Sequence, residues 1–364
     1  MKTRTTTSVF NPGKGVAEYH ALISVTDPSL SFENQLSSVL EACEEASKGR
    51  TVHFRRFFLS DAANQAPQLE QALKARPSVP TSVIQQAPLD GTKIAVWLYG
   101  TSPMECPGGI PTHNGFSHHW TGGLVSAGTH SQQQMAGIFR QFGQALEQKG
   151  LSVAANTVRT WIFVRDVDVN YAGVVTGRRD YFNQMGLTAN THYIASTGIE
   201  GRHPDWWNTV VMDAYSVGGL QKGQLGYLYA RSHLSPTYEY GVTFERGAVL
   251  TYGDRRQIYI SGTASIDKKG DVLFPGNVSA QTGRMLENIG ALLKEADAGL
   301  PDIGMGIVYL RDPADYPVVK KMVSEACPSA PVLYVLGPVC RPAWLVEMEC
   351  IALTPAGNPS FPQY

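Results

Sequence analysis

Residues 344–352 read WLVEMECIA, an apolar run that two acids interrupt at Glu347 and Glu349. Alternate side chains of a strand point to opposite faces, so a strand here places both glutamates on one face. On a half-exposed antiparallel sheet such a face meets water. The alternative is that Glu347, between the apolar Val346 and Met348, is a buried acid with a chemical role.

This stretch closes a pattern of five elements that begins near residue 257. A strand runs into a glycine turn at Gly262, and Gln281 opens a helix whose apolar residues recur at helical spacing. A second strand and a second helix follow before the closing strand. We expect these elements over 257–262, 281–293, 304–312, 316–326 and 344–352.

Two earlier segments follow the same order, which indicates an internal repeat. In each, a glutamine opens the first helix and an aspartate ends the following strand. The second segment predicts elements over 124–128, 134–146, 158–166, 171–185 and 209–217. The first, a shorter echo, predicts them over 21–25, 35–40, 52–61, 69–74 and 94–98.

Three such repeats predict an α+β fold of mixed sheets with helices packed on one face. We expect the repeats to occupy residues 1–110, 111–220 and 221–364. Glycine- and proline-rich linkers are expected near 101–116 and 218–247.

The composition is that of an ordinary globular protein, with 364 residues, 43% hydrophobic and 17% charged residues. A net charge of −1 argues against nucleic acid or an anionic membrane as a partner. No long apolar run and no signal core are found, so we expect a cytoplasmic protein without a membrane span. The five cysteines are scattered and predict no disulfide framework.

Several motifs resemble those of the RidA/YjgF family and, more specifically, of the chorismatases. They are Ser261-Gly262-Thr263-Ala264-Ser265-Ile266, Gln281 with Asn288, Arg159-Thr160-Trp161, Asn170-Tyr171 with Gly177-Arg178 and Phe182, Tyr240-Gly241 with Phe244-Glu245-Arg246-Gly247, and Cys340-Arg341-Pro342 before Leu345-Val346-Glu347. The resemblance covers roughly residues 115–355 and, more weakly, the first segment. Two departures are Glu245, where the family usually has serine, and an unusual insert over 192–207.

The resemblance implies three RidA-like units fused into a pseudo-trimer, with a pocket between units. It also implies cleavage of chorismate, a small anionic substrate, to a hydroxybenzoate and pyruvate. Without gaps, Glu347 aligns with Val211 in the second segment and Ala95 in the first. A carboxylate at one of three equivalent positions predicts a single specialised site in the third repeat.

The resemblance and the chemistry together suggest the site residues. Glu347 is the expected acid, since protonating the enol ether needs a carboxyl with a raised pKa, and Cys340 is the second expected catalytic group. Arginine forks suit the two carboxylates of the substrate. The expected substrate-binding residues are Arg341, Arg246, Arg159, Gly247, Tyr240, Arg178 and Thr263.

Gly247 and Cys340 match the family branch that releases hydroxybenzoate, so 3-hydroxybenzoate is favoured, with 4-hydroxybenzoate and a diene-diol as alternatives. A small residue at 247 is expected to leave room for the ring. The oligomeric state stays open between a monomeric pseudo-trimer and a homo-oligomer.

Two other functions compete with this one. A RidA-like imine or enamine deaminase needs an arginine shortly before the closing strand, where residues 331–336 contain none. A non-catalytic ligand-binding protein is the other. We expect no metal, since the histidines at 113, 118, 119 and 130 have no matching second ligand group, and no cofactor, since no phosphate-loop or dinucleotide motif is present.

Overall fold

A computed structural model describes residues 3–364, apart from the side chain of Tyr240. The chain forms three mixed sheets, each with its own pair of long helices, which we call the first, second and third units. The α+β fold with helices on one face of each sheet is confirmed. The repeat boundaries at residues 110 and 220 stay a prediction.

The first unit has strand order β1-β2-β5-β3-β4. Its elements are β1 (Thr3–Phe10), β2 (Glu18–Val25), α1 (Phe32–Ser47), β3 (Thr51–Leu59), α2 (Ala62–Leu73), β4 (Thr81–Gln85) and β5 (Ile94–Thr101).

The second unit has strand order β6-β7-β10-β8-β9. Its elements are η1 (Pro107–Gly109), β6 (Thr112–His113), β7 (Phe116–Leu124), α3 (Ser131–Glu147), α4 (Val153–Asn156), β8 (Thr157–Val164), α5 (Val167–Gln184), β9 (Ala195–Glu200) and β10 (Val210–Gly218).

The third unit has strand order β11-β12-β13-β16-β14-β15. Its elements are β11 (Leu225–Leu228), η2 (Thr237–Tyr240), β12 (Gly247–Thr251), β13 (Arg256–Ala264), α6 (Val278–Glu295), η3 (Leu300–Asp302), β14 (Ile303–Leu310), η4 (Pro313–Asp315), α7 (Tyr316–Ala326), β15 (Val332–Leu336) and β16 (Val346–Thr354).

Each unit also contains a short strand that the sequence patterns missed, β4, β9 or β15, paired in parallel with β3, β8 or β14. These strands have only five or six residues, too few for a clear alternation. The supposed insert over 192–207 therefore contains a regular member of the repeat, β9. The Thr-rich N-terminus likewise forms β1, and the linker expected near 218–247 contains β11 and η2 and runs into β12.

Two sequence expectations about strand ends are wrong. The strand expected over 124–128 is β7, which ends at Leu124; its buried face carries His118 and Trp120, and Gly122 and Gly123 obscured the pattern. Gly262 is not a turn but lies inside β13, beside a register shift between Ile260 and Thr263.

The repeated glutamine explains why the three units share one shape. The side chain of Gln281 donates to the carbonyls of Phe274 and Ala343 and accepts from the amide of Leu345. In the second unit the side chain of Gln134 accepts the equivalent hydrogen bond from the amide of Thr209, and in the first unit Gln35 accepts it from the amide of Lys93. Each amide thereby ties the start of a helix to the start of the closing strand and satisfies buried backbone groups.

The strand registers confirm the gapless alignment of the closing strands. Glu347 pairs with Tyr309, as Val211 pairs with Phe163 and Ala95 with Phe58. Those three aromatic partners hold equivalent places in the repeats. Positions 347, 211 and 95 are therefore structurally equivalent, and one of these three carries an acid.

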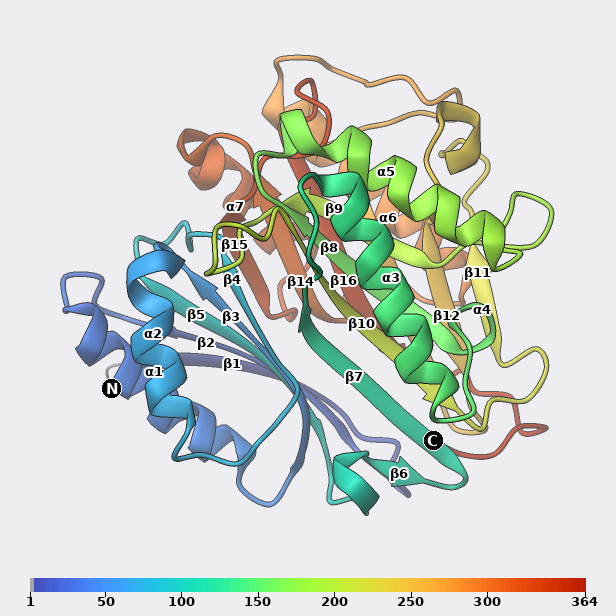
Figure 1. Cartoon of the computed structure of the whole chain (residues 1–364), viewed down its shortest axis with the longest axis horizontal. Coiled ribbons are helices and arrows are strands. Elements are labelled where there is room, and N and C mark those ends of the chain that lie inside the picture. The colour runs from blue at the N-terminus through green and yellow to red at the C-terminus, as the bar shows by residue number, and fades with distance from the viewer. Residues whose placement is uncertain (1–2) are drawn as a thin grey trace.

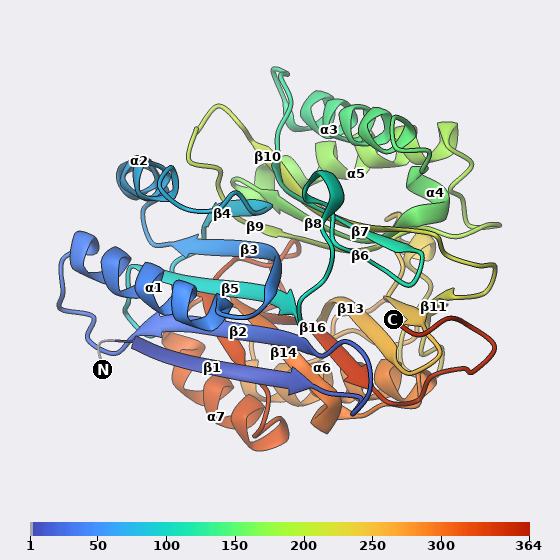
Figure 2. The same cartoon turned by 90° about the horizontal axis from the view of Figure 1, so that it is seen from below.

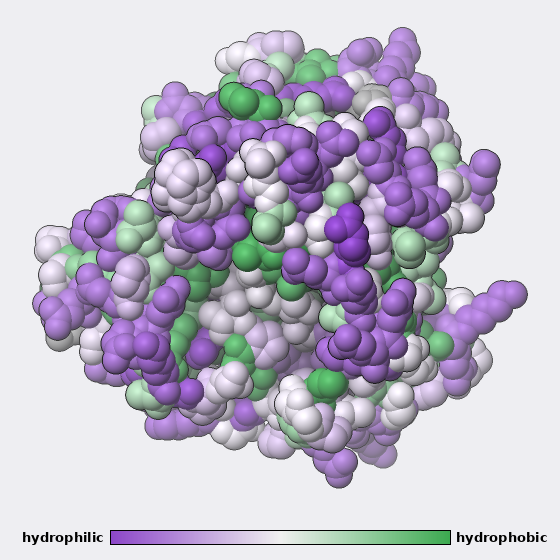
Figure 3. Space-filling view, in the orientation of Figure 1, coloured by the Kyte–Doolittle hydropathy of each residue, from purple (hydrophilic) through white to green (hydrophobic). Residues whose placement is uncertain are grey.

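The three sheets face one another at the centre of the molecule and carry their helices outside. Figure 2 shows the pairs α1–α2, α3–α5 and α6–α7 on three sides, with the strands between them; Figure 1 shows the same units side by side. The shared interior is rich in aromatic rings. Among them are Trp97, Trp120 and Trp161, whose ring centres lie about 6 Å from each other. The face seen in Figure 3 is mostly hydrophilic, with apolar residues in small separate groups.

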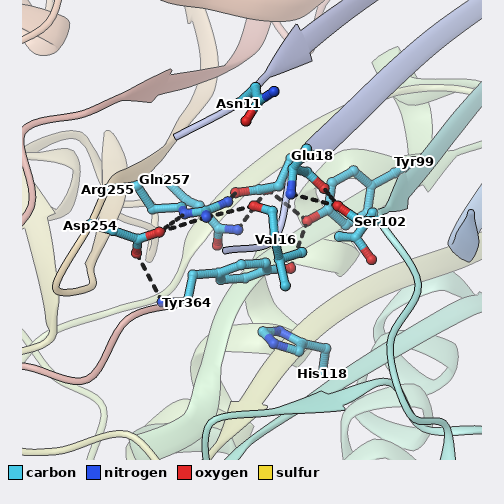
Figure 4. A network of polar contacts seen from close by, with 12 residues as sticks. Asn11, Val16, Glu18, Tyr99, Ser102, His118, Asp254, Arg255, Gln257 and Tyr364 are labelled. Carbon is cyan, nitrogen blue, oxygen red and sulfur yellow. Dashed lines mark hydrogen bonds and ion pairs between the residues drawn. The ribbon is translucent and has the colours of Figure 1, made fainter. Parts of the chain in front are cut away.

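A buried polar network joins the first and third units at one end of this interior (Figure 4). Arg255 donates to Glu18 at 2.9 Å and to the carbonyl of Val16, and both charged side chains are at most 1% exposed. Gln257 and Tyr99 each donate to the second oxygen of Glu18 at 2.8 Å. The carboxylate is thus fully hydrogen-bonded, which offsets the cost of burying it.

No helix within residues 3–364 is long and apolar enough to cross a membrane.

Replacing Arg255 by methionine is expected to lower the free energy of unfolding by about 3 kcal/mol or more, because Glu18 stays buried without its cation. The matched control is Arg4→Met, which breaks the ion pair with Asp90, where the arginine is 56% exposed; that change is expected to cost about 1 kcal/mol or less. Urea unfolding followed by tryptophan fluorescence measures both. Equal midpoints for the two variants would contradict this account of the junction.

Candidate active site

The second and third units meet along β9 and β13, and hydroxyl groups hold the two strands together. The Ser261 hydroxyl accepts from the amide of Ser196 at 2.9 Å and donates to the carbonyl of Glu245 at 2.6 Å. The amide of Gly262 donates to the Thr197 hydroxyl at 2.9 Å. These bonds fix the relative position of two units that are far apart in sequence.

A pocket opens between these two units, with about 520 Å³ of empty space, part of it open to solvent. Its lining comes from α5, β9, the segment before β12, β13, the loop before β16, and β16 itself. The lining residues are Tyr171, Arg178, Ser196, Thr197, Gly198, Val242, Phe244, Arg246, Gly262, Ala264, Ile266, Cys340, Arg341, Trp344 and Glu347.

Glu347 is the acid of this pocket, and its side chain is 5% exposed. Burial raises the pKa of Glu347 from its ordinary 4.5 to about 8, and the nearby negative charge of Glu349 adds to the rise. Arg159 and Arg246 oppose it but do not cancel it. At neutral pH the carboxyl therefore keeps its proton, the state that a general acid needs.

Gly262 makes room for this carboxyl. A Cβ atom at position 262 would lie 2.2 Å from Oε1 of Glu347 and 3.0 Å from a side-chain carbon of Thr197. Both distances are shorter than normal non-bonded contacts, so the neighbouring atoms would have to move. The glycine in the Ser-Gly-Thr motif is thus explained by the acid opposite it rather than by a turn.

Glu349 lies below the pocket and accepts hydrogen bonds from the second unit. Arg159 donates to it at 2.8 Å and Trp161 at 2.9 Å, and the Thr197 hydroxyl also donates to it. Arg159 is 1% exposed and additionally donates to the hydroxyls of Ser261 and Thr197. Of the two alternatives for this face, water-exposed or buried, the structure shows the buried one.

Arg159 does not line the pocket, although the sequence suggested it as a substrate-binding residue. Its guanidinium is occupied by Glu349 and two hydroxyls, so its place is beneath the site. From there it acts on Glu347 through charge and through the position of Glu349.

Three other predicted arginines do line the pocket: Arg178, Arg246 and Arg341. Arg178 donates to the hydroxyl of Thr243 at 3.1 Å, and Arg246 donates to the carbonyl of Ser235 at 3.0 Å. The guanidinium of Arg341 stacks 4.9 Å from the ring centre of Trp344. With Glu347 neutral, these cations make the pocket strongly attractive to an anion.

Cys340 also lines the pocket, in contact with Tyr171. Burial raises the pKa of the Cys340 thiol to about 12, and the negative charge at Glu347 contributes to this. Burial likewise holds the pKa of Tyr171 well above its ordinary value. Both groups are therefore protonated donors at neutral pH. Gly198 accommodates the tyrosine, since a Cβ there would lie 2.9 Å from the ring.

Two further predicted residues lie outside the pocket. Thr263 is buried on the opposite side of β13 from its neighbours Gly262 and Ala264, and its hydroxyl donates to the carbonyl of Ser261. Gly247 faces Leu228 and Ile260, which would lie 3.1 and 3.3 Å from an added Cβ. The room that a glycine leaves at 247 is thus in the core of the third unit and not in the pocket.

The remaining predicted residue, Tyr240, has a side chain that falls outside the described part of the chain. Glu245, the departure noted in the sequence, does not line this pocket: its carboxylate accepts from the amide of Tyr193 at 2.8 Å.

The sequence patterns missed the contribution of β9, where Ser196, Thr197 and Gly198 form one wall. They also missed Phe244, Val242 and Ile266, although Phe244 and Ile266 stand inside quoted motifs. No alternating pattern signals this strand, since Ala195, Ser196 and Thr197 are all buried.

Within residues 3–364 no group of three histidine, cysteine, aspartate or glutamate residues is placed to hold a metal ion. His118, from the sequence cluster, is buried and bonds to the hydroxyl of Tyr215 at 2.8 Å.

Comparisons with known proteins place the third unit in a family. Residues 248–354 match the family model described as Endoribonuclease L-PSP. The 3-aminoacrylate deaminase RutC of Acinetobacter baylyi is 34% identical over 97 residues, which are 26% of this chain and 77% of that protein. The RutC family protein UK114 of Drosophila melanogaster is 36% identical over 104 residues, 27% of this chain and 73% of that protein.

A crystal structure of a chorismatase is similar over nearly the whole chain. It covers 95% of this chain and 99% of its own, with a TM-score of 0.67 and 17% sequence identity. At that identity the likeness establishes the shared three-unit fold.

The protonated state of Glu347 has a consequence for stability. Between pH 5 and pH 8 the folded protein keeps this proton and the unfolded chain releases it, so stability falls as pH rises, by at most about 1.4 kcal/mol per pH unit. Glu347→Gln removes this titration. We therefore expect the variant to gain stability relative to wild type from pH 5 to pH 8, as measured by urea unfolding at several pH values.

The control for this measurement is Glu325→Gln, at an exposed position of α7. Its difference from wild type should not grow over the same interval. A Glu347→Gln difference that is constant with pH would show that the carboxyl is already ionised at pH 5.

Proposed function

The chain belongs to the RutC family, and we propose that the pocket around Glu347 cleaves chorismate to a hydroxybenzoate and pyruvate. The observation that carries the proposal is a buried, protonated carboxyl in a pocket that three arginines line. The similarity in fold to a chorismatase supports it.

Chorismate is a ring compound with two carboxylates and an enolpyruvyl ether. Arg178, Arg246 and Arg341 are suited to bind the carboxylates, because guanidinium groups pair with them in a bidentate way. Phe244, Val242 and Ile266 offer apolar surface for the ring. Both kinds of contact lie next to Glu347.

The first chemical step is proton transfer from Glu347 to the methylene carbon of the enol ether. It turns that carbon into a methyl group and leaves a cation at the ether carbon, next to the oxygen. The new carboxylate at Glu347 lies among Arg246 and Arg159, whose positive charges stabilise it.

Water then adds to the cation, and the resulting hemiketal collapses to pyruvate and a ring diol. Loss of the ring hydroxyl as water, with a ring proton, gives 3-hydroxybenzoate, so no water is consumed overall. The neutral thiol of Cys340, beside Tyr171, is suited to donate a hydrogen bond to the departing hydroxyl. The choice of 3-hydroxybenzoate rests on Cys340, since Gly247 lies outside the pocket.

Turnover of chorismate tests the proposal. Wild type should release pyruvate, and Glu347→Gln should lose at least about a thousandfold in kcat while still binding chorismate, since glutamine keeps the shape but has no proton to give. Wild-type kcat should fall above about pH 8, where Glu347 loses its proton. Coupled pyruvate detection and calorimetric titration measure the two quantities.

Cys340→Ala serves as the companion variant. Pyruvate release should continue, while the ring product shifts from 3-hydroxybenzoate towards the diene-diol, as chromatography of the products would show. Undiminished pyruvate release by Glu347→Gln would reject the acid, and a diene-diol from wild type would reject the branch assignment.

A deaminase is the second candidate, favoured by the identity to the 3-aminoacrylate deaminase RutC. Against it, β15 and the residue before it contain no arginine to bind the substrate carboxylate. Ammonia release from an enamine substrate, without turnover of chorismate, would favour this candidate.

A further inference from the structure

A second pocket lies in the first unit, on the outer side of its sheet and far in sequence from Glu347. About 900 Å³ of empty space, part of it open to solvent, is enclosed between α1, β3, β5 and the segment after α2. Its floor is apolar and consists of Leu40, Cys43, Val52 and Leu98. Leu40 and Leu98 are at most 2% exposed and belong to the core under α1.

The rim of this pocket carries an excess of positive charge. Lys48, Arg50, Arg55 and Arg76 line it, against one acid, Glu44. Glu44 accepts from Arg76 at 2.8 Å, so its charge is already neutralised. Lys48 pairs with Glu45, so within residues 3–364 Arg50 and Arg55 are the rim cations that form no ion pair with a carboxylate.

Arg55 lies on β3, the strand that also carries Val52 of the floor. Its Nε donates to the Thr81 hydroxyl at 2.8 Å, and no ion pair joins it to a carboxylate anywhere in the described residues 3–364. Burial lowers the pKa of Arg55, and the charge of Arg76 adds to this. A half-buried guanidinium beside an apolar surface is suited to pair with the carboxylate of a ligand in this pocket.

We infer that this pocket binds a small amphiphilic monocarboxylate, with its apolar body on Leu40, Val52 and Leu98 and its carboxylate on Arg55. An aromatic acid and a short fatty acid share this chemistry. The site is distinct from the pocket around Glu347, which is lined by the second and third units, and the inference does not depend on the proposed reaction.

Methyl-labelled protein titrated with benzoate, hexanoate and phenol tests the inference. Leu40, Val52 and Leu98 report on this pocket, and Val242 and Ile266 report separately on the pocket around Glu347. We expect benzoate or hexanoate to shift the methyl signals of Leu40, Val52 and Leu98. The acid that binds more tightly shows whether the pocket prefers an aromatic ring or an aliphatic chain. Phenol, which has the ring without the charge, should bind at least about tenfold more weakly.

Arg55→Gln should weaken carboxylate binding at the first set of methyls at least about tenfold and leave the second set unchanged. Arg55→Lys keeps the charge and should retain part of the affinity. No shift at Leu40, Val52 and Leu98, equal affinity for phenol, or unchanged binding by Arg55→Gln would each overturn the inference. If Arg55→Gln does not fold, the comparison of benzoate with phenol on wild type decides it.

Discussion

The ion pair between Arg159 and Glu349 is the interaction on which the site depends. It joins the second unit to the third across 190 residues of sequence, and both side chains are at most 2% exposed. Buried charges persist only when they are paired and fully hydrogen-bonded, and here Trp161 and Thr197 complete the shell. The pair joins β8 to β16 and places a negative charge two residues from Glu347. Burial is the larger cause of the raised pKa of Glu347; the charge of Glu349 adds to it, and Arg159 opposes it.

The three junctions of the pseudo-trimer are built from equivalent positions with different residues. Position 349 corresponds by strand register to Asp213 in the second unit and Trp97 in the first. Asp213 forms an ion pair with Arg56 at 2.8 Å, and the side chain of Arg56 is fully buried. Glu349 and Asp213 thus each form a buried ion pair with an arginine of another unit. Of positions 347, 211 and 95, by contrast, one carries an acid, Glu347. A fused chain allows this difference, whereas identical subunits would repeat every residue at all three junctions.

Much of the fold was predictable because local patterns encode it. The glutamines at 35, 134 and 281 mark equivalent helix starts since each must satisfy buried backbone groups beside its closing strand. The alignment of Glu347 with Val211 and Ala95 follows from strand spacing alone. Contacts between units were not predictable in this way: Arg159 looked like a substrate ligand because its partner lies in another unit, and Gly262 looked like a turn because the carboxyl it accommodates lies on β16. The short strand β9 was missed for its length, and with it one wall of the pocket.

In the proposed reaction the Glu347 carboxyl faces the methylene carbon of bound chorismate. A crystal structure of Glu347→Gln soaked with chorismate would show this arrangement. We expect chorismate between β9 and β13, its carboxylates on Arg178, Arg246 or Arg341, and its methylene carbon against the side chain at 347. Chorismate bound elsewhere, or bound here with the methylene turned away from residue 347, would contradict it.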